Sequence, residues 1–538
     1  MNISGCSFNE LSYSTLFKTY LTNFKKLSSF YEFDPLNDQE FKRRANSLNP
    51  STVNKEQFIS ALSQYHKKLG IEEQQKVPLE KYARDNALTV VTGQQLGVYG
   101  GPVFTIYKTI TAILLARKYE EQLQRPVVPV FWLADEDHDF DEIAWTGITG
   151  RTDFSNIKLE QEGSGIPVSD EKVTEQINSF KEKVKEELFE TDFSESLWEI
   201  LDTHYKEGNT HVQAFSGLIN EWFAGQGVLI VGSNFPGIKK LVSETLQTSI
   251  SESDSISNAI EEKSVELEQE FHRQVTNGDS NLFYLSDSAE RVKINRNKEG
   301  WIAGDTKWTN DELLNEISTH PERFSPNVFL RPIIQDKLLP TLGYIAGPGE
   351  IAYYGQMRSF YGEFDLVMPP IIPRFTATII ESGISRIIEK LPFEVSEYEK
   401  RIEDLESEFV EKTDTVDIEE VFSSWKELME GAAKEPLKII NEIDPTLDGT
   451  VGKTVAGFTN ELDRLKGRVY RSIKQQEETQ INRIEKIKVN LFPDGGLQER
   501  SVSPIYFMNK YGLDIWDKLI HNIEEEGLDL TKHHLIEL

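Results

Sequence analysis

Apolar residues divide the chain into regions of different periodicity. Residues 1–80 place them at helical spacing among polar residues, which predicts amphipathic helices. Between 87 and 134, two short apolar runs, "ALTVVTGQQ" and "RPVVPVFWLA", enclose a helical pattern that begins near Pro102. A nearly all-apolar strand is typical of a parallel sheet covered on both faces. Residues 87–134 therefore predict a β-loop-α-β unit with its functional edge at the carboxyl ends of the strands.

The alternation of strand and helix returns at 227–241, 327–357 and 364–380. Two segments interrupt it, at about 145–200 and 282–326, and the second begins as a small antiparallel hairpin pattern. We therefore predict an α/β fold in which residues 1–383 form a parallel-sheet core with N-terminal helices and inserted connecting segments.

Residues 384–490 follow a different, heptad-like pattern. Apolar residues alternate spacings of three and four in two runs: Val395, Tyr398, Ile402, Leu405 and Phe409, then Val451, Val455, Phe458, Leu462, Leu465 and Val469. The pattern predicts an α-helical coiled-coil domain, an antiparallel hairpin of these two runs with an extra helix near 417–440. An ordinary helical subdomain is the alternative. The tail, 491–538, is expected to return to the core.

Unpartnered seams on such a hairpin predict a homodimer through the coiled coil. The competing possibility is that both seams are covered within one chain. Charge substitutions on a seam would separate the two, because only an intermolecular seam yields a folded monomer.

Composition narrows the class of protein. The 538 residues include 89 acidic and 58 basic side chains, a formal net charge of -31, which argues against a nucleic-acid binder or an anionic membrane surface as partner. The single cysteine, Cys6, excludes an intrachain disulfide and a cysteine-based zinc site. The N-terminal residues lack a signal-peptide pattern, and no apolar run approaches about 20 residues. We therefore expect a cytoplasmic enzyme or assembly factor.

An acidic stretch follows the second apolar strand at once. Its sequence "DEDHDFDE" begins with Asp135, Glu136, Asp137, His138 and Asp139, which are the candidate catalytic residues. Three interpretations are open: a metal site completed from elsewhere, a site for a cationic amine with His138 as acid or base, and a solvated acidic loop. The buried strand before it favours a site, because that strand directs the stretch to the functional edge of the sheet.

Two glycine-rich turns are candidate ligand contacts. Gly93, Gly97, Gly100 and Gly101 lie between a strand and a helix, without the dinucleotide-binding spacing, so a plain tight turn is the alternative. Gly347 and Gly349 precede Glu350, Tyr353 and Gln356, which a helix would place on one face. The stretch "GTVGKT" at 449–454 resembles a phosphate-binding loop but has Leu447 where the first glycine belongs.

Three stretches in this order, "TGQQLGVYGGPVFTIYKT", "PVFWLADEDHDFDEI" and "YIAGPGEIAYYGQ", resemble the BshC family of bacillithiol biosynthesis. The resemblance covers essentially the whole chain. It implies a Rossmann-like core with inserted segments and a coiled coil used for dimerisation. It also implies a ligase that forms an amide bond between the carboxyl group of cysteine and the amine of glucosaminyl-malate, the last step of bacillithiol synthesis.

With that resemblance, ATP with Mg is the expected activating co-substrate, and no resident metal is expected. The polar residues of the motifs and the nearby strand ends become substrate-binding candidates: Thr92, Gln94, Gln95, Lys108, Arg331, Gln335, Glu350, Tyr353, Gln356 and Arg374. The six glycines of the two turns become candidate contacts for the co-substrate. Two other functions stay open: a non-catalytic coiled-coil scaffold, and a sugar-nucleotide transferase.

Overall fold

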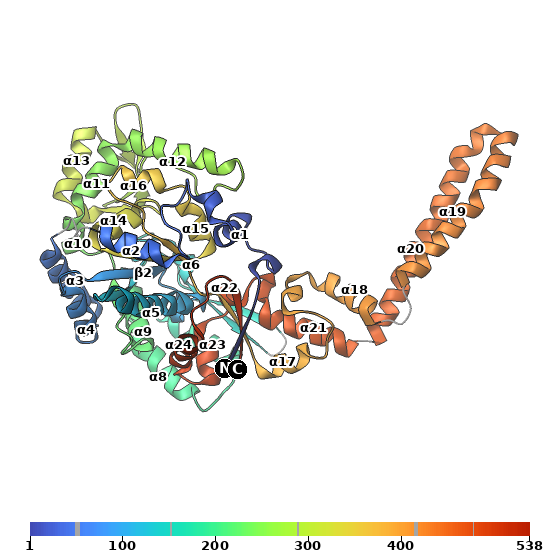
Figure 1. Cartoon of the computed structure of the whole chain (residues 1–538), viewed down its shortest axis with the longest axis horizontal. Helices are drawn as coiled ribbons and strands as arrows, with labels where there is room; N and C mark the ends of the chain where they lie inside the picture. Colours follow the sequence, from blue (N-terminus) through green and yellow to red (C-terminus); the bar gives the residue numbers. More distant parts are fainter. Residues whose placement is uncertain (49–53, 151–152, 288–289, 414–417, 477) are drawn as a thin grey trace. The chain divides into compact units, whose positions relative to one another are not determined.

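In the computed structural model the chain forms two compact units (Figure 1). The structure describes residues 1–48, 54–150, 153–287, 290–413, 418–476 and 478–538. The first unit comprises Met1–Gly150, Phe154–Thr378 and Gln498–Ile536, and the second is mainly Ile379–Leu497. The segment Gln498–Ile536 therefore belongs to the first unit, although it follows the second unit in the sequence.

A five-stranded parallel sheet forms the centre of the first unit. Its order is β14 (Ile371–Pro373), β13 (Thr341–Ala346), β2 (Leu88–Gln94), β3 (Val127–Leu133) and β6 (Leu229–Val231). All residues of β3 and β13 are buried, as their apolar runs predict. The predicted fold class, a Rossmann-like parallel-sheet core followed by a helical coiled-coil domain, is confirmed.

The order of the strands creates a crevice beside β2. From β2 the chain continues to β3 and β6 on one side, and it later returns to β13 and β14 on the other side. Ligands of open parallel sheets bind where the order reverses in this way, at the carboxyl ends of the strands. Helix α5 (Phe104–Leu123) connects β2 to β3 and packs on β2, β3 and β13.

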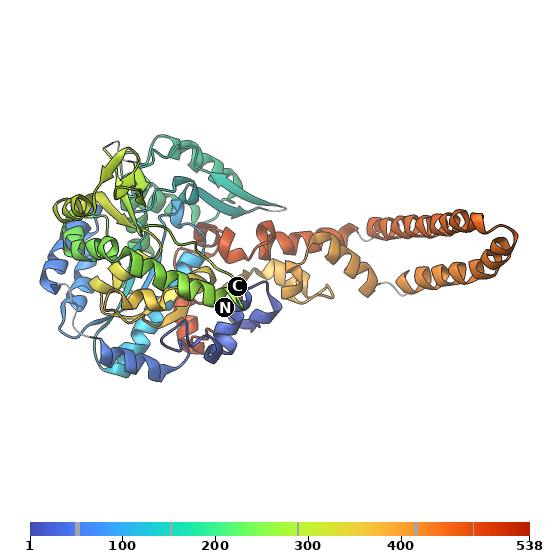
Figure 2. The ribbon, with the colours of Figure 1, turned by 90° about the horizontal axis from the view of Figure 1, so that it is seen from above.

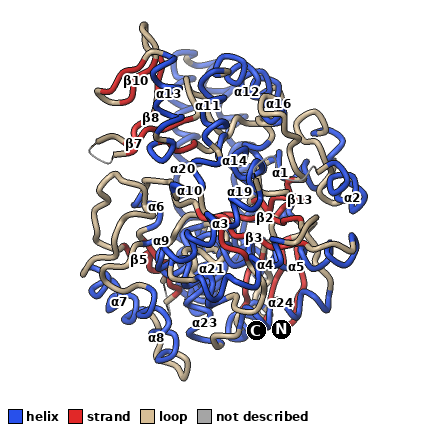
Figure 3. Tube along the Cα trace, turned by 90° about the vertical axis from the view of Figure 1, so that its left-hand side faces the viewer, coloured by secondary structure: helices blue, strands red, loops and turns tan. Residues whose placement is uncertain are grey.

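Two insertions bring antiparallel strands to the first unit. The earlier one contains the pair β4 (Trp145–Thr149) and β5 (Phe154–Lys158). The later one contains two three-stranded sheets, β12-β7-β8 and β11-β10-β9, seen together in Figure 3. Their strands are β7 (Leu282–Leu285), β8 (Arg291–Lys293), β9 (Asn295–Arg296), β10 (Trp301–Ala303), β11 (Thr306–Trp308) and β12 (Phe324–Pro326).

Helices surround these sheets. Those of the first unit also include α1 (Thr15–Thr22), α2 (Asp38–Ser47), α3 (Lys55–Leu69), α4 (Glu72–Ala83), α6 (Phe140–Ile143), α7 (Gln176–Glu187), α8 (Ser194–His204), α9 (His211–Trp222), α10 (Pro236–Leu241), α11 (Ser243–Ser251), α12 (Ser253–Glu268), α13 (Asn310–Thr319), α14 (Leu330–Leu338), α15 (Pro348–Tyr354), α16 (Arg358–Gly362), α22 (Gln498–Ser501), α23 (Pro504–Tyr511) and α24 (Ile515–Glu526). Near the termini, β1 (Asn2–Cys6) and β16 (His533–Glu537) form a sheet with β15 (Ala377–Ile380).

Two sequence-based expectations differ from this fold. Residues 327–338 were expected to begin as a strand but contain helix α14. The side chain of Asn327 accepts hydrogen bonds from the amides of Phe329 and Leu330, at 3.0 Å each, where this helix begins. Residues 364–380 were expected to form one strand and its loop but hold two strands, β14 and β15, which belong to different sheets.

The second unit is helical. It contains α17 (Ser382–Ile388), α18 (Ile402–Thr413), α19 (Ile418–Ile443), α20 (Asp448–Gln476) and α21 (Glu478–Leu491). Helices α19 and α20 pack side by side as an antiparallel hairpin (Figure 2). The stretch "GTVGKT" lies inside α20, as a helical segment.

The hairpin is not the one that the heptads predicted. The run 395–409 is split between a 3₁₀ turn, Val395–Glu399, and α18, because Lys400 adopts an extended backbone with ψ 162°. The partner of α20 in the hairpin is therefore α19, the predicted extra helix, whose first expected residue, 417, lies outside the described residues.

The glycine-rich connection between β2 and α5 is closely packed. Gly100 has φ +91°, and a Cβ atom there would lie 2.4 Å from the ring of Trp222. A Cβ atom on Gly97 would lie 2.7 Å from the Cα of Gly101. This corrects the prediction of a ligand contact at Gly97 and Gly100: their missing side chains make room for protein atoms. Gly101 has φ +67°, a left-handed backbone that favours glycine.

Gly100→Ala should therefore destabilise the protein. The added methyl group meets an indole ring and the residue must keep a left-handed backbone, so we expect the free energy of unfolding to fall by about 1–3 kcal/mol. Thermal unfolding followed by circular dichroism measures this. Gly362→Ala is the control, because no atom lies within 4 Å of the position that its new methyl group would take; equal melting temperatures for both variants would contradict the packing argument.

Candidate active site

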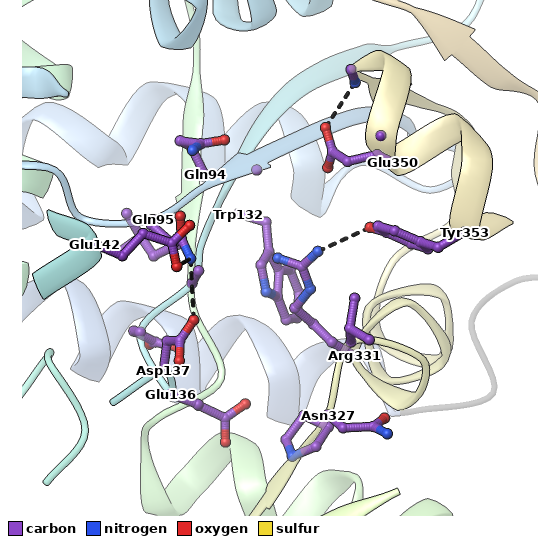
Figure 4. A pocket seen from close by; sticks show the side chains of 18 of the residues that line it. Gln94, Gln95, Trp132, Glu136, Asp137, Glu142, Asn327, Arg331, Glu350 and Tyr353 are labelled. Carbon is purple, nitrogen blue, oxygen red and sulfur yellow. Dashed lines mark hydrogen bonds between the residues drawn. The ribbon is translucent and has the colours of Figure 1, made fainter. Parts of the chain in front are cut away.

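A cavity of about 630 Å³ opens at the carboxyl edge of the central sheet (Figure 4). Each central strand delivers lining residues directly after it ends: Gln94 and Gln95 after β2, Ala134 to His138 after β3, Ser233 after β6, Gly347 to Glu350 after β13, and Arg374 after β14. Others come from α5, the later insertion, α14, α15 and the C-terminal segment: Phe104, Lys108, Phe283, Arg291, Asn327, Arg331, Tyr353 and Arg500. The cavity thus lies at the point where the strand order reverses.

One wall of the cavity is acidic and comprises Asp135, Glu136, Asp137, His138 and Glu142. Asp135 and Glu136 form the buried part of this acidic wall. Asp135 is fully buried and accepts hydrogen bonds from the Tyr65 hydroxyl at 2.6 Å and from the amides of Ser233 and Asn234 at 3.2 and 3.1 Å. Burial raises the pKa of Asp135 despite these bonds. Glu136 accepts a hydrogen bond from the Ser233 hydroxyl at 2.5 Å, on the side of the sheet where β6 ends.

Asp137 and His138 form the more exposed part of the acidic wall. His138 Nδ1 lies 3.0 Å from Arg291 Nη1, a group that can only donate, and 3.5 Å from Asp137 Oδ1. The shorter contact favours the tautomer in which Nδ1 accepts a hydrogen bond and Nε2 is the donor. Burial alone would raise the pKa of Asp137, but Arg291 and hydrogen bonds from Gln95 and nearby amides lower it. Asp137 is therefore ionised at neutral pH.

Gln95 joins this wall to helix α6. Its side-chain amide donates to Asp137 at 3.3 Å and to Glu142 at 2.5 Å (Figure 4). Burial and the nearby charges of Asp137 and Asp139 raise the pKa of Glu142, and the hydrogen bond from Gln95 opposes this rise. The wall therefore holds several carboxylates in positions fixed by donors from β2 and from the later insertion.

The opposite wall is built around Lys108 and Glu350. The Lys108 ammonium, with 3% of its side chain exposed, pairs with Glu350 and donates to the Gly93 carbonyl at 3.0 Å and to Gln94 Oε1 at 3.1 Å. Glu350 also accepts from the Gly347 amide and the Tyr344 hydroxyl, each at 2.8 Å. Burial would raise the pKa of Glu350, but Lys108 and the Gly347 amide lower it. Lys108 thus fixes the two strand ends that border the crevice.

Arginines supply the remaining charge of this wall. Arg374 forms two hydrogen bonds with the fully buried Glu499, at 2.7 and 2.5 Å. Arg331, at the start of α14, donates to the Tyr353 hydroxyl at 3.3 Å and has no carboxylate within 4 Å in the described part of the chain. Arg500 also lines the cavity, with no side-chain partner among the described residues. Among the described residues that line the cavity, Arg331 and Arg500 are therefore the cations left to bind a ligand.

Many of the predicted site residues meet in this cavity. Those that line it are Gly93, Gln94, Gln95, Lys108, Asp135, Glu136, Asp137, His138, Arg331, Gly347, Gly349, Glu350, Tyr353 and Arg374. They come from four strand ends and three helices, so the sequence motifs are brought together by the sheet.

Besides Gly97, Gly100 and Gly101, four predicted site residues lie outside the cavity lining, and their prediction is corrected. Thr92 donates to the Ile345 carbonyl inside the sheet, and Gln335 bonds to its neighbour Asp336. Gln356 is fully buried and holds Ser264 and the backbone of Val275. Asp139 caps α6 by accepting from the Glu142 amide at 3.2 Å. Each of these side chains is already used by the fold.

The sequence analysis missed several cavity residues. Arg291 lies on β8 of the later insertion, and Arg500 lies in the C-terminal segment, so nothing in the spacing of the motifs points to either. Ser233 and Asn327 could have been found, because each follows or precedes a predicted element at the same edge of the sheet. Glu142 belongs to the acidic stretch itself but is not among the candidates predicted from it.

The described ranges of the chain hold no preformed metal cage: no group of three or more histidine, cysteine, aspartate or glutamate side chains there is arranged to hold a metal ion. None of the helices in these ranges is both long and apolar enough to cross a membrane.

Comparisons with known proteins agree with this fold. Residues 1–375 match the family described as "Bacillithiol biosynthesis BshC, N-terminal Rossmann-like domain", and residues 377–538 match its "C-terminal coiled-coil domain". Relatives named "Putative cysteine ligase BshC" include those of Salinibacter ruber, 29% identical with 98% of this chain and 96% of the relative covered, and Chloroherpeton thalassium, 31% identical with 98% and 97% covered. The relative from Bacillus cereus is 28% identical, with 96% of this chain and 97% of the relative covered.

The printed names of these relatives are those of a ligase, which is the class of enzyme that the sequence resemblance predicted. The two family matches follow one another along the chain and leave residue 376 alone between them. The family predicted from three short motifs is confirmed: the chain belongs to the BshC family of bacillithiol biosynthesis.

Proposed function

We propose that this protein is a ligase that joins the carboxyl group of cysteine to the amine of glucosaminyl-malate, the last step of bacillithiol biosynthesis. One observation supports the proposal most: the same cavity has an acidic wall and a second wall with two arginines. In the described part of the chain, neither arginine is paired with a carboxylate. An acceptor with an ammonium group at one end and carboxylates at the other matches both walls. The name of the relatives supports the choice of cysteine as donor.

The acidic wall suits the amine. Asp137 and Glu142 attract an ammonium group, and a carboxylate next to it can accept the proton that the amine must lose before it attacks a carbonyl carbon. His138, with its proton on Nε2, serves as a hydrogen-bond donor in this arrangement. It would hold an oxygen of the donor carboxyl group, a role different from the acid or base expected from the sequence.

The malate end requires cations with free donors. Arg331 presents a planar guanidinium in the cavity and is held by Tyr353 on one side only (Figure 4). Guanidinium groups bind carboxylates with two parallel hydrogen bonds, so Arg331 suits one malate carboxylate and Arg500 the other. Lys108 and Arg374, which the sequence analysis also proposed for this end, are occupied by Glu350 and Glu499.

Amide formation from a free carboxylate in water requires activation, for which we propose ATP with Mg. Magnesium usually binds phosphate oxygens and one or two carboxylates, so a preformed three-residue cage is not required. The two ionic walls do not favour a non-catalytic scaffold, and no described feature favours a sugar-nucleotide transferase.

The proposal predicts the effect of losing the acidic wall. The test uses a bacterial strain that lacks the gene for this protein and carries a variant instead. Asp137→Asn and His138→Ala should each accumulate as folded protein and fail to restore bacillithiol, because the amine and the donor carboxyl group lose their partners. Bacillithiol and glucosaminyl-malate are measured by mass spectrometry of cell extracts. Asp305→Asn, in an exposed turn, is the matched control and should restore the thiol. Normal bacillithiol with Asp137→Asn and His138→Ala would refute the assignment.

Arg331→Met tests the other wall. Losing one charged hydrogen-bonding group costs about 1.5–3 kcal/mol, so glucosaminyl-malate should bind roughly 10- to 100-fold more weakly. Titration calorimetry with the purified protein measures this, and Arg84→Met, on an exposed residue, should bind as the wild type does. Unchanged affinity with Arg331→Met would place the malate end elsewhere.

We also propose that the protein is a homodimer through its second unit. The hairpin of α19 and α20 exposes large apolar side chains, which monomeric surfaces rarely gather in this way: Val421, Trp425, Leu428, Ile439, Ile443, Phe458 and Leu465. Leu405 and Leu462, from the predicted seams, are instead buried within the chain. The exposed set is therefore the better candidate for the contact between two copies.

Leu428→Glu combined with Ile443→Glu should give a folded monomer, because these side chains are 71% and 77% exposed and contribute little to the core. Light scattering should then report about 61.6 kDa for the variant and twice this mass for the wild type. Ser424→Glu with Thr450→Glu adds the same charge to exposed polar positions of the hairpin and should remain dimeric. A wild-type protein of single-chain mass would refute the dimer.

A further inference from the structure

Lys239 is a buried lysine that lies directly behind the acidic wall. It belongs to α10, and only 2% of its side chain is exposed. Its ammonium nitrogen contacts Glu136 and donates to the Phe324 carbonyl at 2.5 Å. Glu136 lines the cavity, whereas Lys239 does not. Glu136 therefore connects this lysine to the cavity.

Charged groups from several elements face this lysine. Asp135, in the loop after β3, is close enough to act on its charge, and so is Arg291 of the later insertion. Of the helices packed on α10, α3 contributes Tyr65, which is bonded to Asp135, and His66, which is bonded to the Ile230 carbonyl.

The other neighbouring charges face away. Arg323, in the 3₁₀ turn that packs on α10, pairs with Glu316 at 3.2 Å, and Glu244 of α11 is exposed. The local set that acts on Lys239 is therefore two carboxylates, Asp135 and Glu136, and one arginine, Arg291.

Burial lowers the pKa of Lys239 to about 7, with Asp135 opposing the shift and Arg291 adding to it. A neutral amine is thus accessible at this position near neutral pH, which is exceptional for lysine. As pH rises through this value the neutral fraction increases, and as pH falls the ammonium form returns.

We infer that Lys239 positions Glu136 and also receives, at the end of the transfer, the proton that the substrate amine loses. In this step, which rests on the proposed function, the substrate ammonium gives one proton to a Glu136 oxygen. Glu136 passes a proton to the neutral Lys239 amine, which becomes an ammonium ion. The substrate amine keeps its lone pair for attack on the donor carbonyl carbon, and no electrons are gained or lost. The proton leaves by the reverse path once product has gone.

A purely structural ion pair predicts different behaviour. If Lys239 only fixes Glu136, a permanently charged arginine would replace it. If Lys239 must accept a proton, arginine cannot replace it, because its guanidinium does not deprotonate in proteins. Lys239→Arg therefore separates the two roles, and Lys240→Arg, the same change at the exposed next residue, is the matched control.

The first measurement does not depend on catalysis. The wild-type protein, labelled with carbon-13 at the lysine ε-carbon, is titrated by NMR, and the Lys239 signal is assigned by its absence in Lys239→Arg or, if that variant does not fold, in Lys239→Met. We expect this signal to titrate near pH 7. If every lysine signal titrates above about pH 9, as ordinary lysines do, the inference is overturned.

The second measurement tests the transfer itself. In the strain without its own gene, folded Lys239→Arg should leave bacillithiol at least about tenfold below the Lys240→Arg level, since loss of acid-base assistance slows reactions by about 10² or more. Wild-type bacillithiol with Lys239→Arg would overturn the inference. If the strain makes bacillithiol without any copy of the gene, the proposed function fails, whereas the NMR titration still decides whether Lys239 titrates near neutrality.

Discussion

Burial of the central strands on both faces is the constraint on which the rest of the structure depends. Strands such as β3, which has no exposed residue, leave no place for polar side chains along their length. Charges therefore collect where the strands end, and the return of the chain beside β2 opens a crevice between those ends. Each buried charge there then requires a partner, because an uncompensated one would cost several kcal/mol. The acidic and cationic walls both follow from this requirement.

Pairing also distinguishes the charges that maintain the fold from those that are available to a ligand. Lys108 is held by Glu350, and Arg374 by Glu499, so neither cation can turn to a substrate without leaving a buried carboxylate unpaired. Arg331 has a tyrosine hydroxyl as its side-chain partner. The same reasoning separates Asp139, which caps a helix, from Asp137, which lines the cavity.

The sequence predicted what depends on local order and missed what depends on distant contacts. The parallel strands, the acidic stretch after β3 and the turn before Glu350 are encoded by residues next to one another, and all of them line or border the cavity. Gly100 was misread because its neighbour, Trp222, lies more than a hundred residues away along the chain. Arg291 was missed for the same reason, because its side chain comes to the cavity from an insertion that is distant in the sequence. Spacing alone does not show which segments the fold will bring together.

The pair of Arg374 and Glu499 has a consequence for synthesis on the ribosome. Glu499 and Arg500 follow the whole helical unit in the chain, and Gln498–Ile536 folds back into the first unit. While the nascent chain ends before this segment, Arg374 has no carboxylate and the cavity lacks Arg500. A prematurely terminated polypeptide would thus carry all the sequence motifs and still have an incomplete cavity. The cavity is therefore completed only after residues 498–500 have been synthesised and have folded back into the first unit.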